Sequence, residues 1–134
     1  MSDEKENYDG FFRYSIRGDE LELDKLQEKL GLPITLYKKG DIINKYNHNI
    51  VQKTNRCVYQ KEKSCDSKSS VQAFLTQNIR VLYSKKDLLK EYIKNFTNCL
   101  EFIVYADNKT DIILTKTNIK YLSELGLRLT ISFN

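Results

Sequence analysis

The chain has few of the residue types that carry acid–base, nucleophilic or metal chemistry, and their spacing forms no recognised site. Its one histidine, His48, lies among asparagines and lysines with no Ser or Cys placed beside it as a nucleophile. The three cysteines form no Cys-x-x-Cys pair, so no zinc site is predicted. Cys57 and Cys99 fall in strand-like segments and are expected to be buried, whereas Cys65 falls in a polar stretch expected to be a loop. These residues favour a protein with no catalytic residue, no metal and no cofactor.

Two further charged groups could bind ions, but local structure explains each more simply. The acidic residues between positions 19 and 24 lack the glycine and the distal glutamate of a calcium-binding loop. Acids there suit the first turn of a helix, where the helix dipole favours negative charge. The run Lys38-Lys39-Gly40 lacks the remaining glycines of a phosphate-binding loop and is typical of a turn.

A basic segment in the middle of the chain is its most distinctive chemical feature. Residues 1–30 carry five basic and nine acidic side chains, a net charge of −4, whereas residues 31–70 carry eight and three, a net charge of +5. Tyrosines are interleaved with these cations, which suits contact with an acidic protein or with single-stranded nucleic acid. A solvated lysine-rich loop is the remaining interpretation. The residues expected to contact a partner are Tyr37, Lys38, Lys39, Lys45, Tyr46, Arg56 and Tyr59.

The apolar residues around this segment predict strands and helices. Period-two alternation predicts strands, and apolar residues three or four apart predict helices. The irregular stretch from Ile42 to Arg56 is expected to be a long loop, and residues 99–106 a central strand paired with a short strand at 112–114. Ser70 and Ser84 are expected to cap the two middle helices. The predicted strands are residues 11–17, 34–37, 57–61, 99–106, 112–114 and 127–133, and the predicted helices are residues 23–30, 71–82, 88–96 and 119–125.

These elements predict an α+β fold with a mixed, mostly antiparallel sheet of about six strands and helices packed on one face. The 134 residues, 40% hydrophobic and 30% charged, suit a single domain over residues 1–134, with residues 1–10 as a frayed tail. No apolar run approaches the roughly 18 residues that cross a bilayer. The acidic, polar start lacks the basic and apolar parts of a secretory signal, so the chain is expected to be cytoplasmic and to bind no membrane.

The order of motifs along the chain resembles a known family. A strand, a Gly-Asp turn and a helix that opens with acids lead to Leu30-Gly31, Pro33, Thr35, an aromatic residue and Lys-Lys-Gly-Asp. A later helix around residues 71–75 and the Leu-Gly-Leu before the last strand follow the same layout. This order is similar to that of the bacterial domain of unknown function 4279 family, although Pro33 follows Gly31 by two residues where the family pattern has three. The resemblance covers nearly the whole chain.

The resemblance implies a small bacterial α+β domain with no established activity and no assigned catalytic residue. Small single-domain bacterial families of this kind often resemble immunity proteins, which neutralise a toxin by covering its active surface. We therefore expect a non-enzymatic protein-binding module that contacts an acidic surface on its partner. The alternatives are a single-stranded nucleic-acid-binding domain that uses the same residues, and a small-molecule binder whose site the sequence does not reveal.

Overall fold

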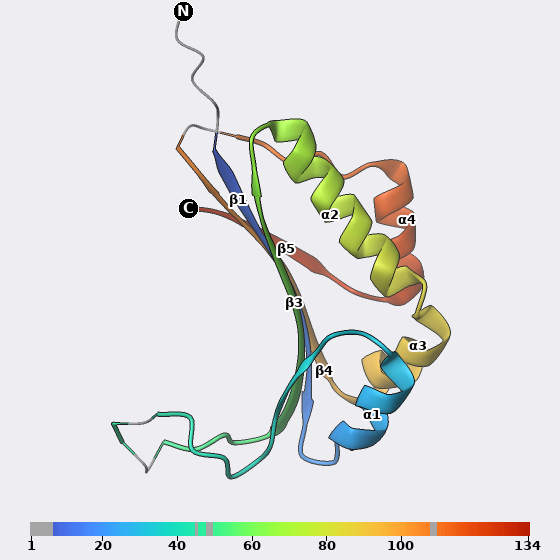
Figure 1. The fold of residues 1–134 in the computed structure, drawn as a ribbon. Helices are drawn as coiled ribbons and strands as arrows, with labels where there is room; N and C mark the ends of the chain where they lie inside the picture. The colour runs from blue at the N-terminus through green and yellow to red at the C-terminus, as the bar shows by residue number, and fades with distance from the viewer. Residues whose placement is uncertain (1–6, 45, 48–49, 108–109) are drawn as a thin grey trace, which may run out of the picture.

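The computed structural model describes residues 7–44, 46–47, 50–107 and 110–134. Within these ranges, five strands form one mixed sheet in the order β2-β3-β1-β4-β5 (Figure 1). β5 runs parallel to β4, whereas the other neighbouring strands are antiparallel. This arrangement confirms the predicted α+β class and the mostly antiparallel mixed sheet. The strands are β1 (Tyr8–Gly18), β2 (Thr35–Tyr37), β3 (Asn55–Cys65), β4 (Thr97–Ala106) and β5 (Leu129–Phe133).

The helices of the described ranges cover one face of the sheet and leave the other face open (Figure 1). Each helix buries an apolar stripe, as α1 does with Leu23, Leu26 and Leu30 at helical spacing. Gly31 and Gly126 end α1 and α4 with φ values of 65° and 78°, a left-handed conformation that glycine adopts without a steric penalty. The helices are α1 (Leu23–Leu30), α2 (Lys68–Tyr83), α3 (Lys86–Asn95) and α4 (Lys116–Leu125).

Alternation along the middle strand separates the two faces of the sheet. In β1, Phe12, Tyr14 and Ile16 are at most 2% exposed, because they point into the helix layer. Burying one such side chain stabilises the fold by about 1.5–3 kcal/mol. The hydroxyl of Tyr14 donates a hydrogen bond to the Asn98 side chain, so its burial leaves no unpaired donor. The residues that alternate with them, Arg13, Ser15 and Arg17, point to the other side, which we call the open face.

The sheet has five strands where about six were expected, because residues 112–114 form no strand. The predicted hairpin at the end of β4 is wrong, since β4 is followed by the crossover through α4 that a parallel neighbour requires. Instead of pairing with β4, Ile113 is held by Gln72 of α2, whose side-chain oxygen accepts from the Ile113 N–H at 3.0 Å. β4 lies inside the sheet between β1 and β5, as predicted for a central strand, while β1 is the middle strand and β5 lies at an edge.

Two strands extend further than the sequence predicted, because each pairs with a long neighbour. β1 begins at Tyr8, which is only 4% exposed, so residues 8–10 belong to the sheet; the predicted tail otherwise falls mainly on residues 1–6, outside the described residues. β3 pairs with β1 as far as Cys65, which is consequently buried in the sheet and does not lie in a polar loop. Cys99 is exposed, because it lies at an open-face position of β4 opposite Ser15.

The two serine caps also differ from the prediction. Ser67 caps α2, since its side-chain oxygen accepts from the Ser70 N–H at 3.2 Å. Ser84 lies at the C-terminal end of α2, where its N–H donates to the Arg80 carbonyl at 2.9 Å. Because α3 follows after only one further residue, Lys85 precedes it without a side-chain cap.

Candidate functional site

Part of the basic segment forms an arm that projects away from the sheet (Figure 1). The described residues of the arm are 38–44, 46–47 and 50–54, between the end of β2 and the start of β3. Its two sides are joined by the Ile42–Val51 bridge and by backbone hydrogen bonds from Gly40 N–H to Gln52 O and from Gln52 N–H to Asp41 O, at 2.8 and 2.7 Å. The predicted long loop is therefore an irregular two-stranded extension, held by its own backbone.

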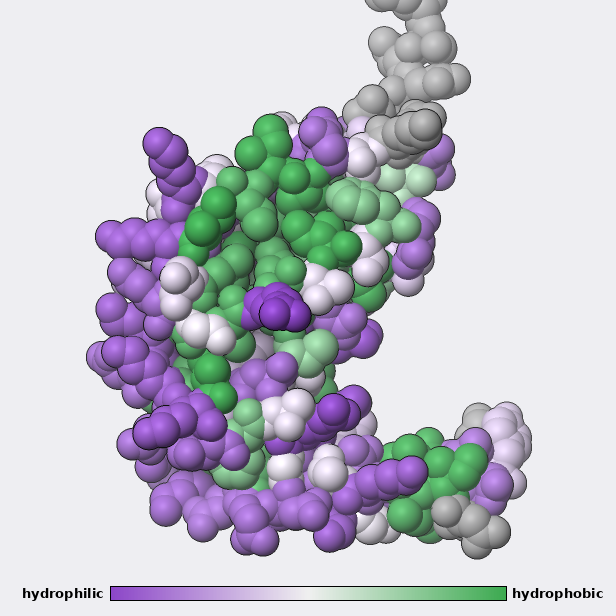
Figure 2. Space-filling view, turned by 180° about the vertical axis from the view of Figure 1, so that it is seen from behind, coloured by the Kyte–Doolittle hydropathy of each residue, from purple (hydrophilic) through white to green (hydrophobic). Residues whose placement is uncertain are grey.

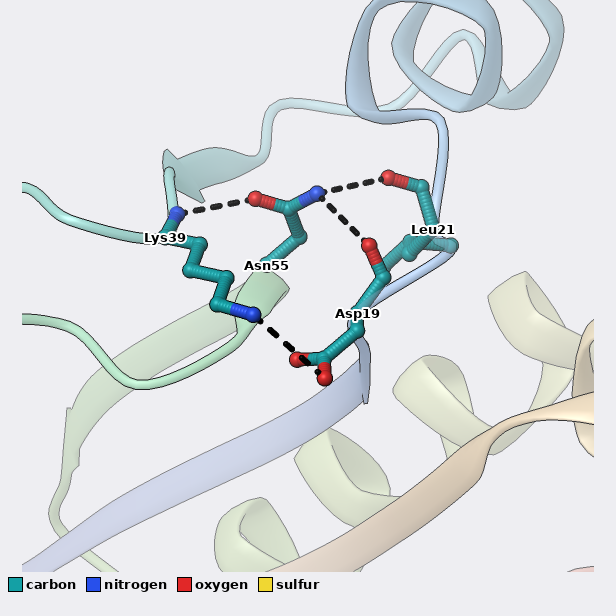
Figure 3. A network of polar contacts seen from close by, with 4 residues as sticks. All are labelled: Asp19, Leu21, Lys39 and Asn55. Atoms are coloured by element: carbon teal, nitrogen blue, oxygen red, sulfur yellow. Dashed lines mark hydrogen bonds and ion pairs between the residues drawn. The ribbon is translucent and has the colours of Figure 1, made fainter.

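Asn55 fixes the root of the arm to the turn after β1 (Figure 3). Its side-chain oxygen accepts from the Lys39 N–H at 2.8 Å, and its amide donates to the carbonyl oxygens of Leu21 at 3.1 Å and Asp19 at 3.4 Å. Lys39 Nζ also lies 3.5 Å from Asp19 Oδ2. Gly40 follows with a φ of 91°, which allows the sharp bend into the arm. The arm thus leaves the body in a direction set by several polar contacts.

The tip of the arm exposes aliphatic side chains to solvent. Ile42 is 57% exposed and Ile43 is 53% exposed, and Ile50 and Val51 are exposed beside them. Tyr46 is also exposed at the tip. Figure 2 shows this apolar group as a patch on the arm, separated from the body by a concavity. Exposed aliphatic residues gathered on one projection are typical of a protein-interaction surface.

A hollow of about 560 Å³ lies between the arm and the open face of the sheet. Ile43, Ile50 and Val51 line it from the arm, and Arg17, Tyr37 and Arg56 line it from three neighbouring strands. Because Tyr37 is paired with Arg56, and Arg56 with Arg17, the three form one row across the sheet. The Arg56 guanidinium carbon lies 4.7 Å from the centre of the Tyr37 ring, a cation–π contact. The hollow therefore has three aliphatic side chains on the arm, beside Gln52, Lys53 and Thr54, and two arginines on the sheet.

Two of the predicted partner-binding residues, Tyr37 and Arg56, line this hollow. Lys38, Lys39 and Tyr46 are exposed on the arm, and Tyr37 and Arg56 are half-buried at its base. Lys45 and His48 lie outside the described residues.

Tyr59 is a wrong prediction. It is 3% exposed and faces the helices, where its hydroxyl donates to Asn78 Oδ1 at 2.9 Å and its ring meets Phe12 edge-on. The cause is its position three residues after Arg56, which places it on the opposite face of β3. The sequence prediction missed Arg17, although the alternation of β1 had placed it opposite the buried face.

The described groups with shifted pKa values lie in the core or on the helices α3 and α4. Burial raises the pKa of the Cys57 thiol to about 11, and burial also raises the pKa values of Tyr14 and Tyr59. A thiol that stays protonated at neutral pH is a poor nucleophile. In the described part of the chain, no group of three His, Cys, Asp or Glu side chains is placed to hold a metal ion. The chemistry that this surface offers is hydrogen bonding, charge and apolar contact.

These features define an α+β domain whose sheet carries a projecting arm and a cationic hollow. The chain belongs to the family described as a domain of unknown function, DUF4279, whose model matches residues 12–134. No curated protein and no solved structure matches the chain. The helices of the described residues all fall short of the length and apolar character that crossing a bilayer demands.

Proposed function

We propose that this protein is a non-enzymatic binding module whose arm and hollow contact an acidic surface of a protein partner. The observation that carries the proposal is the aliphatic tip of residues 42, 43, 50 and 51, exposed on an arm with cations at its root. The tip supplies apolar area that a partner can remove from water. Lys38, Lys53, Arg17 and Arg56 supply positive potential that steers an acidic partner towards it.

The side-chain types favour a protein over a nucleic acid. Single-stranded nucleic acid is bound by aromatic side chains on which bases stack, between cations that contact phosphates. Here the described side chains that line the arm's wall of the hollow are aliphatic or polar rather than aromatic, and Tyr37 is already covered on one face by Arg56. Tyr59, which the sequence suggested as a further stacking platform, is buried. An oligonucleotide would leave the aliphatic wall without a partner.

In its narrower form, the proposal is that the protein is a cytoplasmic bacterial immunity protein. Such a protein neutralises a toxin by covering its active surface, which requires a rigid body and a projecting contact element rather than catalytic groups. The anchored arm fits this requirement, and an acidic toxin surface would match its basic root. The family resemblance supports this form only by analogy.

A capture experiment with matched variants tests the proposal. Tagged protein is incubated with host lysate at low salt, as the wild type, as the arm variant Ile42→Ser/Ile43→Ser and as the control Ile119→Ser. Ile119 is a suitable control because it is equally exposed, at 53%, but lies on α4. We expect the wild type and the control to capture the same acidic protein and the arm variant to lose it. Equal capture by all three variants would contradict the proposal.

A second part of the experiment tests the nucleic-acid alternative. The charge-reversed variant Lys38→Glu/Lys39→Glu/Arg56→Glu should lose the protein partner, and rising salt should weaken wild-type capture. A fluorescent single-stranded oligonucleotide is titrated in parallel. Tight, steeply salt-dependent binding of the oligonucleotide without a captured protein would replace the proposed function by its alternative.

A further inference from the structure

The open face carries two arginines directly opposite each other in neighbouring strands. Arg17 of β1 is paired with Arg56 of β3, so their side chains leave the same side of the sheet. Like charges at directly opposed positions destabilise a sheet. Both side chains line the hollow beside the arm. The fold therefore holds two positive charges together in the wall of the hollow.

A second arginine on the same strand shows how the protein normally satisfies such a charge. Arg13 lies on the open face four residues before Arg17, and Glu101 of β4 approaches its guanidinium at 3.3 Å. Gln60 of β3 accepts from Arg13 Nε at 3.0 Å. Thus each neighbouring strand provides one oxygen ligand to Arg13.

The corresponding oxygen ligands are missing around Arg17. Its neighbour on β4 is Thr97, and its neighbour on β3 is the second arginine, Arg56. Among the described residues, no carboxylate lies within ion-pair distance of either guanidinium, and Arg56 Nε is buried without a hydrogen-bond acceptor. A buried donor without an acceptor carries a free-energy cost that an incoming oxygen atom removes.

We propose that Arg17 and Arg56 together bind one carboxylate side chain, an Asp or Glu, of the partner protein. This inference rests on the proposed function and identifies the group that the partner places in the hollow. Guanidinium groups bind carboxylates through two parallel hydrogen bonds, and Tyr37 holds Arg56 in place by stacking on it. The apolar neighbours of that acid pack on Ile43 and Val51. A phosphate would satisfy the cations but not this aliphatic wall, which is why we assign a carboxylate.

Titration with a matched pair of peptides tests the assignment. The probes are a blocked leucine–aspartate–leucine tripeptide and the same peptide with asparagine, and the readout is the NMR signal of each arginine Nε–H. We expect the aspartate peptide to bind at least about tenfold more tightly. Arg17→Gln and Arg56→Gln should each abolish this preference, whereas the control Arg13→Gln should keep it. Equal binding of the two peptides, no binding, or tighter binding of inorganic phosphate than of the aspartate peptide would each overturn the assignment.

Two further measurements separate this inference from the proposed function and from a purely structural role. Without ligand, Arg17→Gln should raise the midpoint of thermal unfolding, because it removes like-charge repulsion, and Arg13→Gln should lower it. A fall with Arg17→Gln would mean that Arg17 serves stability, which would overturn the inference.

The peptide titration and the capture experiment can fail independently. If the protein binds the aspartate peptide more tightly than the asparagine peptide but Ile42→Ser/Ile43→Ser still captures the partner, the proposed function fails and the carboxylate site stands. If the arm variant loses the partner but the protein binds both peptides equally, the proposed function stands and the carboxylate site fails.

Discussion

The helix-covered face of the sheet and the arm use the same residue types in opposite ways. On the covered face Ile16 is 1% exposed, and Ile79 of α2 in the same core is 0% exposed, because the helix layer and the sheet exclude water from them. On the arm, Ile42 and Ile43 remain more than half exposed. Apolar area on the covered face therefore contributes to folding, whereas apolar area on the arm stays in contact with water and, in the proposed function, is covered by a partner. Stability and binding should consequently respond to different substitutions.

The largest expected effect is the loss of a core side chain. Phe12 is 0% exposed between the sheet and the helices, so Phe12→Ala should lower the free energy of unfolding by about 3–5 kcal/mol. Ile43→Ala on the arm should change it by less than about 0.5 kcal/mol. Urea denaturation followed by circular dichroism measures both values. Similar losses in the two variants would show that the arm packs on the body and is not set apart from it.

Alkaline pH should destabilise the covered face before it affects the arm. The Cys57 thiol has a pKa of about 11 in the folded chain, above its ordinary value of 9.0, because burial disfavours the thiolate. Between these two pKa values the unfolded chain releases a proton that the folded chain keeps. The contribution of the thiol to the free energy of unfolding is therefore complete below pH 9 and is lost as the pH rises towards 11. The loss should be about 1–2 kcal/mol, since solvent screens part of the effect.

Urea denaturation at several pH values checks this prediction with Cys57→Ala as the comparison. The substitution should make the fall in stability between pH 9 and 11 shallower, while Tyr14 and Tyr59, whose pKa values burial also raises, sustain some fall. An unchanged slope in the variant would assign the alkaline loss to the other groups whose pKa values burial raises, Cys65 and Tyr92 among them.

The root of the arm should respond locally to a change at its bend. Gly40 has a φ of 91° and open space around it, so Gly40→Ala costs backbone strain of about 1 kcal/mol without a steric clash. Hydrogen exchange at Gln52, whose N–H donates to Asp41 O, should accelerate about fivefold. Exchange in β1 should not change. Faster exchange in both places would mean that the arm and the sheet open as one unit.

The smallest effects are expected from substitutions of Arg13 and Arg17 on the open face. Arg17→Thr should raise the free energy of unfolding by about 0.2–1 kcal/mol, since it removes repulsion from Arg56. Arg13→Thr should lower it by a similar amount, because it removes the contacts with Glu101 and Gln60. Chemical denaturation of both variants at low salt measures the difference. Changes of the same sign would remove the contrast on which the carboxylate site depends.

Local patterns predicted most of the elements, and they failed where contacts between distant residues decide. The spacing of Leu23, Leu26 and Leu30 sufficed for α1, since a helix satisfies its backbone within one segment. Residues 112–114 have strand-like composition but no strand to pair with, because β4 already lies between β1 and β5. Composition indicates which segments could form strands, but the arrangement of the whole sheet determines which of them find a partner strand.

In the candidate site, too, local sequence predicted some residues, whereas contacts between distant segments decided others. Lys38 and Lys39 are exposed as predicted, because charged side chains in a turn have little reason to be buried. Tyr59 was assigned to the surface from its basic neighbours, although its own position in the alternation of β3 places it in the core. Arg17 and Arg56 lie far apart in the chain, and only the pairing of β1 with β3 makes them neighbours.

By itself, the sequence determined the fold class, the family and the presence of a basic segment, because hydrophobic periodicity and residue order are properties of consecutive residues. The tertiary structure decided the register of the strands, the direction of the arm and the meeting of the two arginines in one hollow. The physical reason is that a strand satisfies its backbone only through partners elsewhere in the chain. Which partner it meets, and in which register, depends on the packing of the whole fold.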